Sequence, residues 1–143
     1  MINENIKRIL VPLDGSKNSF KGLDEAIYLA KHFNSTITAL CVISSYPPLP
    51  LMGRQIPYEK HILEQVKKFM SNAKKTCVAN KIKFNEKIIK GITTLDIAEF
   101  ASDNKFDLIV MSSRGMNPVK ELFLGSVSNA VVHKSKIPVL VVK

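Results

Sequence analysis

Five short strand-like runs, four of them apolar and the third partly charged, alternate with helical segments along this chain, and this alternation is the feature that most restricts its fold. The predicted strands are Arg8 to Pro12, Thr36 to Ile43, Lys81 to Lys90, Asp107 to Ser112 and Pro138 to Val142. Strands separated by helices form βαβ units, in which the strands are parallel and helices cover both faces of the sheet. With 143 residues, the chain is expected to form one α/β domain, residues 1–143, around a doubly wound five-stranded parallel sheet.

The helices between these runs begin at recognisable local signals. Predicted helices run from about Lys17 to Phe33, from Pro57 to Asn80 and from Thr93 to about Asp103, and a fourth follows Gly125. Ser16 is a suitable N-cap for the first helix. Thr93 with Asp96 three residues later resembles a capping box for the third. The charged positions of the third strand predict that it lies at an edge of the sheet.

The stretch from Asp107 to Lys143 carries the strongest functional signal from the residues alone. It reads as a strand, a loop of small residues (Ser112-Ser113-Arg114-Gly115), and a helix that starts at Gly125-Ser126 and leads into the last strand. The first backbone amides of a helix have no partner within that helix, and they favour an anion. The sequence therefore predicts a phosphate or similar anion near Gly125 and Ser126.

These residues resemble the universal stress protein family, in particular its nucleotide-binding branch. That branch carries G-x-x-G, nine residues, then G-[S/T], and binds the ribose and phosphates of ATP there. Gly115, the nine residues Met116 to Leu124, and Gly125-Ser126 match the second and third elements. Ser112 stands where the first glycine belongs. Its side chain either crowds a ligand through Cβ or donates a hydroxyl to it, and the sequence leaves both possibilities open.

The resemblance covers Ile9 to Lys143 and implies the adenine-nucleotide alpha-hydrolase-like architecture, with strand order 3-2-1-4-5. In that order the first and fourth strands are neighbours, and their carboxyl ends flank a crevice. Taken alone, Asp14 is a turn residue that satisfies its own backbone; the resemblance makes it the ribose ligand. The implied contacts are Pro12, Leu13, Val42 and Met111 for adenine, Asp14 for ribose, and Ser112, Gly115, Gly125, Ser126, Val127 and Ser128 for ribose and phosphates.

The expected ligand is ATP or AMP, with Mg or Mn entering only through the nucleotide phosphates. No catalytic residue is predicted, because no nucleophile has a recognisable base, no Walker-type lysine follows a glycine-rich loop, and no carboxylates cluster. At most, slow ATP hydrolysis is expected. The three histidines have no ligand spacing, and Cys41 and Cys77 are isolated. We therefore expect no resident metal and two reduced core thiols.

The function expected from these features is that of a stress-response sensor or regulator that binds an adenine nucleotide. One alternative is a stress protein that binds no nucleotide and acts through as yet unknown protein partners, which Ser112 favours. A weaker alternative is an ATP pyrophosphatase-like enzyme, because Leu13 to Ser19 distantly resembles the S-G-G-x-D-S loop of that class. Only a glycine and serines correspond, in a different arrangement.

Charge and hydropathy restrict location and partners. The chain has a net charge of +9, but its lysines are spread over predicted helices and loops, so solvated helix faces are expected rather than a nucleic-acid groove. No apolar run approaches about 20 residues, and the amino terminus lacks the apolar segment of a signal peptide. A cytoplasmic protein without a membrane segment is expected.

Two further expectations concern the surface. The last strand is apolar and, in the implied order, lies at a sheet edge, where it could pair with a second copy. The resembling family commonly dimerises through this strand, so a homodimer is expected. The proline-rich stretch from Ser44 to Ile56 is long for a connection in a compact domain and is predicted to be a lid or a mobile loop.

Overall fold

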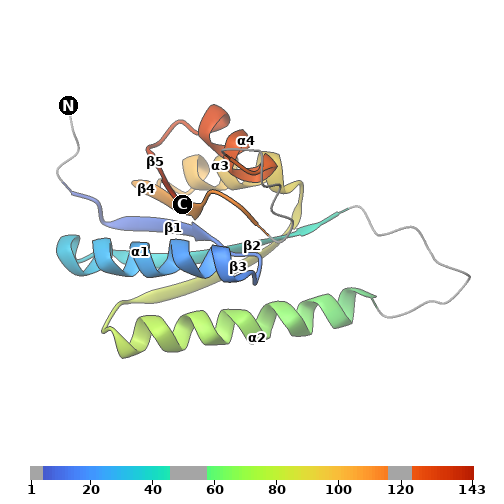
Figure 1. Cartoon of the computed structure of the whole chain (residues 1–143), viewed down its shortest axis with the longest axis horizontal. Helices are drawn as coiled ribbons and strands as arrows, with labels where there is room; N and C mark the ends of the chain where they lie inside the picture. Colours follow the sequence, from blue (N-terminus) through green and yellow to red (C-terminus); the bar gives the residue numbers. More distant parts are fainter. Residues whose placement is uncertain (1–4, 46–57, 116–123) are drawn as a thin grey trace, which may run out of the picture.

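A computed structural model describes residues 5–45, 58–115 and 124–143 of the chain. Its centre is one parallel sheet in the order β3-β2-β1-β4-β5 (Figure 1). The strands are β1 (Arg8–Pro12), β2 (Thr36–Ser44), β3 (Phe84–Gly91), β4 (Leu108–Ser112) and β5 (Val139–Val142). Every neighbouring pair is parallel. The predicted fold class, strand order and edge position of β3 are confirmed.

Two helices cover each face of this sheet. The helices are α1 (Lys17–Phe33), α2 (Tyr58–Ala79), α3 (Thr93–Asp103) and α4 (Ser126–Lys134). Figure 1 shows α1 and α2 on one side of the sheet and α3 and α4 on the other. Within the described residues, no helix is long and apolar enough to cross a membrane. The predicted lid falls largely in residues 46–57, which lie outside the described residues. Pro57, the predicted start of the second helix, belongs to the same range.

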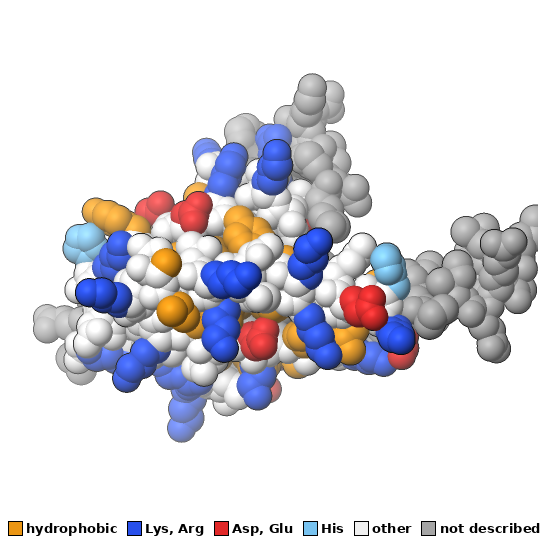
Figure 2. Space-filling model, turned by 90° about the horizontal axis from the view of Figure 1, so that it is seen from below, with side chains coloured by type: hydrophobic (Ala, Val, Ile, Leu, Met, Phe, Trp, Pro, Cys, Tyr) orange, Lys and Arg blue, Asp and Glu red, His pale blue; other side chains and the backbone are white. Residues whose placement is uncertain are grey.

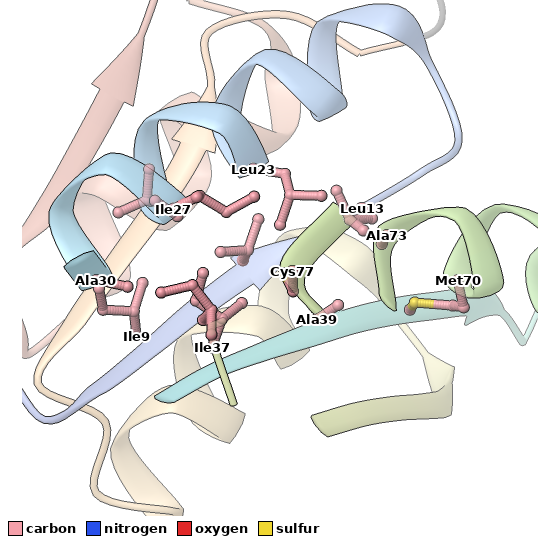
Figure 3. Packing of buried hydrophobic residues seen from close by; sticks show 14 of the residues in the cluster. Ile9, Leu13, Leu23, Ile27, Ala30, Ile37, Ala39, Met70, Ala73 and Cys77 are labelled. Atoms are coloured by element: carbon pink, nitrogen blue, oxygen red, sulfur yellow. The ribbon is translucent and has the colours of Figure 1, made fainter. Parts of the chain in front are cut away.

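The strand residues alternate between two hydrophobic cores. Ile9 and Ile37 point toward α1 and α2, where they pack in a cluster that includes Leu23, Ala73 and Cys77 (Figure 3). Leu10 and Leu40 on the same strands point the other way and join a second cluster under α3 and α4. Its buried members are Leu10, Leu40, Ile97, Ala101, Phe106, Ile109, Met111 and Val131. Burial of both faces is the reason that the central strands contain continuous apolar runs.

Of the two helix starts predicted from capping residues, one is confirmed and one is wrong. Ser16 is the N-cap of α1, and its side chain accepts a hydrogen bond from the Ser19 amide at 3.1 Å. The capping box predicted at Thr93 is wrong. Ile92 occupies the N-cap position, and its amide donates to Oδ2 of Asp96 at 2.7 Å. The carboxylate thus satisfies an amide at the helix start without help from the Thr93 hydroxyl.

Candidate functional site

A cavity of about 310 Å³ opens at the carboxyl ends of β1 and β4. The connections of a doubly wound sheet diverge at this point, which leaves space between the loops. All eleven residues that the sequence analysis assigned to a ligand line this cavity. Five further lining residues were not anticipated: Ser19, Leu40, Thr93, Ile97 and Arg114. The segment 116–123, which joins the two halves of the glycine motif, lies outside the described residues.

One wall of the cavity is apolar. It is formed by side chains from the ends of the central strands and from α3, namely Pro12, Leu13, Leu40, Val42, Ile97 and Met111. Most of these residues belong to the hydrophobic cores or pack against them, so the wall is continuous with the protein interior. A flat aromatic group is the kind of ligand that such a wall accommodates.

Asp14 lies at the end of β1 and meets the loop that follows β4. Its Oδ1 accepts a hydrogen bond from the Ser16 amide at 2.9 Å, so the turn role expected from the residues alone is present. A Cβ added to Gly115 would lie 2.7 Å from Oδ2 of Asp14. A larger residue at this position would therefore require the Asp14 carboxylate to shift. A carboxylate accepts several hydrogen bonds, so the bond to Ser16 is compatible with a second partner.

Ser112 shows a third arrangement beside the two that the sequence left open. Its hydroxyl donates to the Arg114 carbonyl at 2.7 Å and so closes the turn after β4. Behind it, α1 packs so tightly that a Cβ on Gly22 would lie 3.1 Å from the Ser112 amide nitrogen. Gly22 was not singled out in the sequence, although a glycine inside a helical pattern is itself a signal of close packing.

The start of α4 forms the polar end of the cavity. Gly125 is the N-cap, in an extended conformation, and it has no side chain to bond the first amides of the helix. The amides of Ser126, Val127 and Ser128 are therefore without intrahelical acceptors, and they carry the positive end of the helix dipole. The Ser126 side chain is exposed, whereas Ser128 is buried at 2% exposure.

The Ser128 hydroxyl is engaged within the protein. It donates to the Ser113 carbonyl at 2.8 Å and lies 3.1 Å from the Gly125 carbonyl. The Gly125 amide donates to the same Ser113 oxygen at 2.6 Å. These bonds hold the first turn of α4 against the end of β4. The Ser128 hydroxyl would have to leave them in order to donate to a ligand.

Cys41 lies in the core beside the cavity residue Val42 and does not itself line the cavity. Burial, with a smaller contribution from the negative charge of Asp14, raises the pKa of the Cys41 thiol to about 11. Cys41 is therefore a neutral thiol near pH 7 rather than a nucleophilic thiolate. Within the described ranges, no three His, Cys, Asp or Glu side chains are grouped as metal ligands.

The chain has the doubly wound α/β fold, with an apolar, carboxylate-bearing pocket at the switch point, where proteins of this fold class commonly hold their ligands. The profile of the universal stress protein family matches residues 5–143. The chain belongs to the universal stress protein family. It is 33% identical over 143 residues to universal stress protein MJ0531 of Methanocaldococcus jannaschii, covering 98% of this chain and 84% of that protein.

Solved structures share the fold over nearly the whole chain. Protein MJ0577, also from Methanocaldococcus jannaschii, aligns with a TM-score of 0.83 and 31% identity over 96% of each chain. A universal stress protein from Archaeoglobus fulgidus in complex with dAMP aligns with a TM-score of 0.71 and 23% identity, covering all of both chains. A universal stress protein in complex with cAMP aligns with a TM-score of 0.70 and 24% identity, covering 97% and 98%.

Proposed function

We propose that this protein binds an adenine nucleotide, ATP or AMP, in the cavity between β1 and β4, and acts as a nucleotide-dependent regulator of a stress response. The observation that carries the proposal is the placement of Asp14 and the uncapped start of α4 around one apolar-walled cavity. Two proteins of the same fold are described as complexes with dAMP and cAMP. The proposed location of this protein is the cytoplasm, as expected from the sequence.

The lining residues fit the three parts of such a ligand. The apolar wall around Val42 and Met111 would enclose adenine, and the Asp14 carboxylate would accept hydrogen bonds from ribose hydroxyls. The amides of Ser126 and Val127 would donate to phosphate oxygens. Mg or Mn would enter with the phosphates. The cavity of about 310 Å³ falls at the lower end of the range for ligand sites, about 300 to 1,000 Å³.

The proposal includes no catalytic residue. The described residues that line the cavity include no histidine, and none of their hydroxyls is paired with a base. Hydrolysis of bound ATP is therefore expected to be slow at most, because general acid–base catalysis needs a group placed to take the proton from water.

Titration calorimetry of the ligand-free protein with ATP and with AMP, in the presence of magnesium, tests the proposal. Saturable micromolar binding is expected. Gly125→Asp should abolish it, because an aspartate at an N-cap accepts hydrogen bonds from the helix amides and occupies the phosphate position with a negative charge.

Gly125→Ala is the matched control. A Cβ at this position would lie 3.1 Å from the Ser113 carbonyl oxygen, so both variants introduce the same tight contact. Only the aspartate adds an anion. Loss of binding in Gly125→Asp but retention in Gly125→Ala supports a phosphate site at α4. Equal binding by Gly125→Asp and the parent would place the nucleotide elsewhere.

A second candidate function follows from Ser112. Ser112 lines the cavity at the position where the nucleotide-binding branch of the family has glycine. Its hydroxyl donates a hydrogen bond to the Arg114 carbonyl. If neither ATP nor AMP binds at millimolar concentration but both bind to Ser112→Gly, the serine closes the site. The protein would then act through protein partners without a nucleotide.

A further inference from the structure

The positive charge of this chain is concentrated on α2 and the turn that leads from it into β3. Residues 65–85 contain six lysines and no carboxylate, whereas residues 96–107 contain four carboxylates and one lysine. We call the six lysines the α2 lysine surface: Lys67, Lys68, Lys74, Lys75, Lys81 and Lys83. All six are exposed. A charge excess that served only solubility would have no reason to be separated in this way.

The helix geometry places Lys68 and Lys75 on the side of α2 that faces away from the protein and Lys67 and Lys74 on its flank, while Lys81 and Lys83 follow in the turn. The opposite side is buried through Val66, Met70, Ala73 and Cys77. Lys67 and Lys74 are seven residues apart, as are Lys68 and Lys75, so each pair forms a row with a spacing of about 10 Å along the axis. Figure 2 views this side and shows blue basic side chains distributed across it with few red acidic ones.

The α2 lysine surface makes no ion pair among the described residues, although Glu64 lies one turn before Lys67 and Lys68 on the same helix. Across the described part of the chain, the one ion pair joins Lys90 to Glu59 at 3.0 Å, and neither residue belongs to this surface. Six unpaired ammonium groups on about one helix length repel each other, and a polyanion relieves that repulsion while releasing its own counterions.

We propose that the α2 lysine surface binds the phosphate backbone of double-stranded nucleic acid without sequence preference. From the sequence alone, these lysines were expected to lie on solvated helix faces. The fold changes that interpretation, because it leaves all six exposed on one element and its turn, without ion pairs. Lysine contacts phosphate as a point charge and does not require a defined orientation. The surface lies on α2, apart from the residues that line the cavity at the ends of β1 and β4.

Other polyanionic or protein partners fit this surface less well. Single-stranded nucleic acid is bound by aromatic platforms, and the exposed large aromatic residues among those described, Tyr28 and Phe33, lie on α1. A bilayer is bound by helices with a continuous face of large apolar side chains, whereas the exposed large apolar residues on the described part of α2 are Leu63 at 37% and Val78 at 60% exposure, far apart along the helix. Protein interfaces favour Arg, Tyr and Trp and are depleted of Lys. A surface dominated by lysines, with Val78 as its exposed apolar residue, matches the regular phosphates of a duplex.

Fluorescence anisotropy with a labelled mixed-sequence DNA duplex of about 30 base pairs tests the proposal on the full chain. Binding is expected at about 50 mM salt, with a slope of log K against log salt near −5 if all six lysines contact phosphates. A fourfold variant replaces four lysines of α2 with glutamine: Lys67, Lys68, Lys74 and Lys75. It should raise Kd by about 100-fold or more and reduce the slope to about −2.

A matched variant removes the same charge elsewhere, at exposed lysines outside α2: Lys31, Lys105, Lys136 and Lys143. It should retain most of the affinity of the parent. Absence of duplex binding by the parent at low salt, or equal losses in the two variants, would overturn the proposal. Binding to phosphatidylserine vesicles without binding to DNA would also overturn it and would identify a membrane surface instead. Gly125→Asp should bind DNA like the parent, which separates this surface from the nucleotide site.

Discussion

At the scale of single residues, the peptide group of Ser113 joins three elements at the site. Its carbonyl accepts hydrogen bonds from the Gly125 amide and the Ser128 hydroxyl, and its amide donates to the Val142 carbonyl at 2.8 Å. The end of β4 is thereby linked to both α4 and β5. Ser128, which the sequence analysis assigned to the ligand, is in the structure a residue that positions the start of α4.

Ser128→Ala should therefore destabilise the protein and weaken nucleotide binding together. Loss of one buried hydrogen bond is expected to lower the free energy of unfolding by about 1 kcal/mol. The affinity for ATP and the affinity for AMP should fall by equal factors. Urea unfolding and calorimetry measure the two effects. Ser126→Ala is the control for stability, because the Ser126 residue is exposed. An unchanged unfolding free energy in Ser128→Ala would contradict the positioning role.

At the scale of the element, β5 is an edge strand with one free side. The carbonyls of Pro138 and Val142 accept hydrogen bonds from Ile109 and Ser113, so they point toward β4. Backbone groups alternate in direction along a parallel strand, which places those of Val139 and Val141 on the outer side. Leu140 is 37% exposed. An edge of this kind can pair with a second copy, as proposed from the sequence.

Val141→Pro should convert the proposed homodimer into a monomer without disrupting the sheet. Proline removes an amide that points outward and is tolerated on an edge strand for that reason. Sedimentation at micromolar concentration measures the change, and urea unfolding checks the fold. Leu140→Pro is the comparison, because it removes an amide directed at β4 and should be the more destabilising of the two. A parent protein that sediments as a monomer would refute the dimer.

At the scale of the whole molecule, two buried thiols link stability to pH. Cys41 and Cys77 lie in the core between the sheet and α1 and α2. Burial raises the pKa of each thiol from 9.0 to about 11. The folded protein therefore holds these thiol protons more tightly than the unfolded chain does. The resulting stability is fully present below pH 9.0 and is lost as pH rises through the folded pKa values.

The free energy of unfolding should accordingly fall between about pH 8 and about pH 10.5 by a larger amount in the parent than in Cys41→Ala/Cys77→Ala. The double variant lacks the thiols but keeps the lysines, which titrate in the same range. Urea unfolding under reducing conditions measures both proteins at each pH. A difference between the two proteins that stays constant with pH would mean that the thiols do not contribute.

The features that the sequence predicted correctly depend on residues close together in the chain. Alternating apolar runs predicted the βαβ units, because burial on a parallel sheet is visible in each run separately. Ser16 caps α1 through an amide three residues away, and Gly125 stands directly before the helix that it starts. The strand order came from the family resemblance, because hydrophobic periodicity does not report which strands are neighbours.

The features that only the tertiary structure decided depend on partners that the chain brings together from a distance. The Asp107 carboxylate accepts hydrogen bonds from the amides of Lys7 and Arg8, each at 2.9 Å, about a hundred residues away in sequence. The contact between Asp14 and Gly115 likewise exists because β1 and β4 are neighbours. The family resemblance predicted eleven of the residues that line the cavity, whereas residue types and spacing alone indicated only an anion site near Gly125. Whether a given hydroxyl faces a ligand or bonds the protein depends on the acceptors around it, and packing alone places those acceptors.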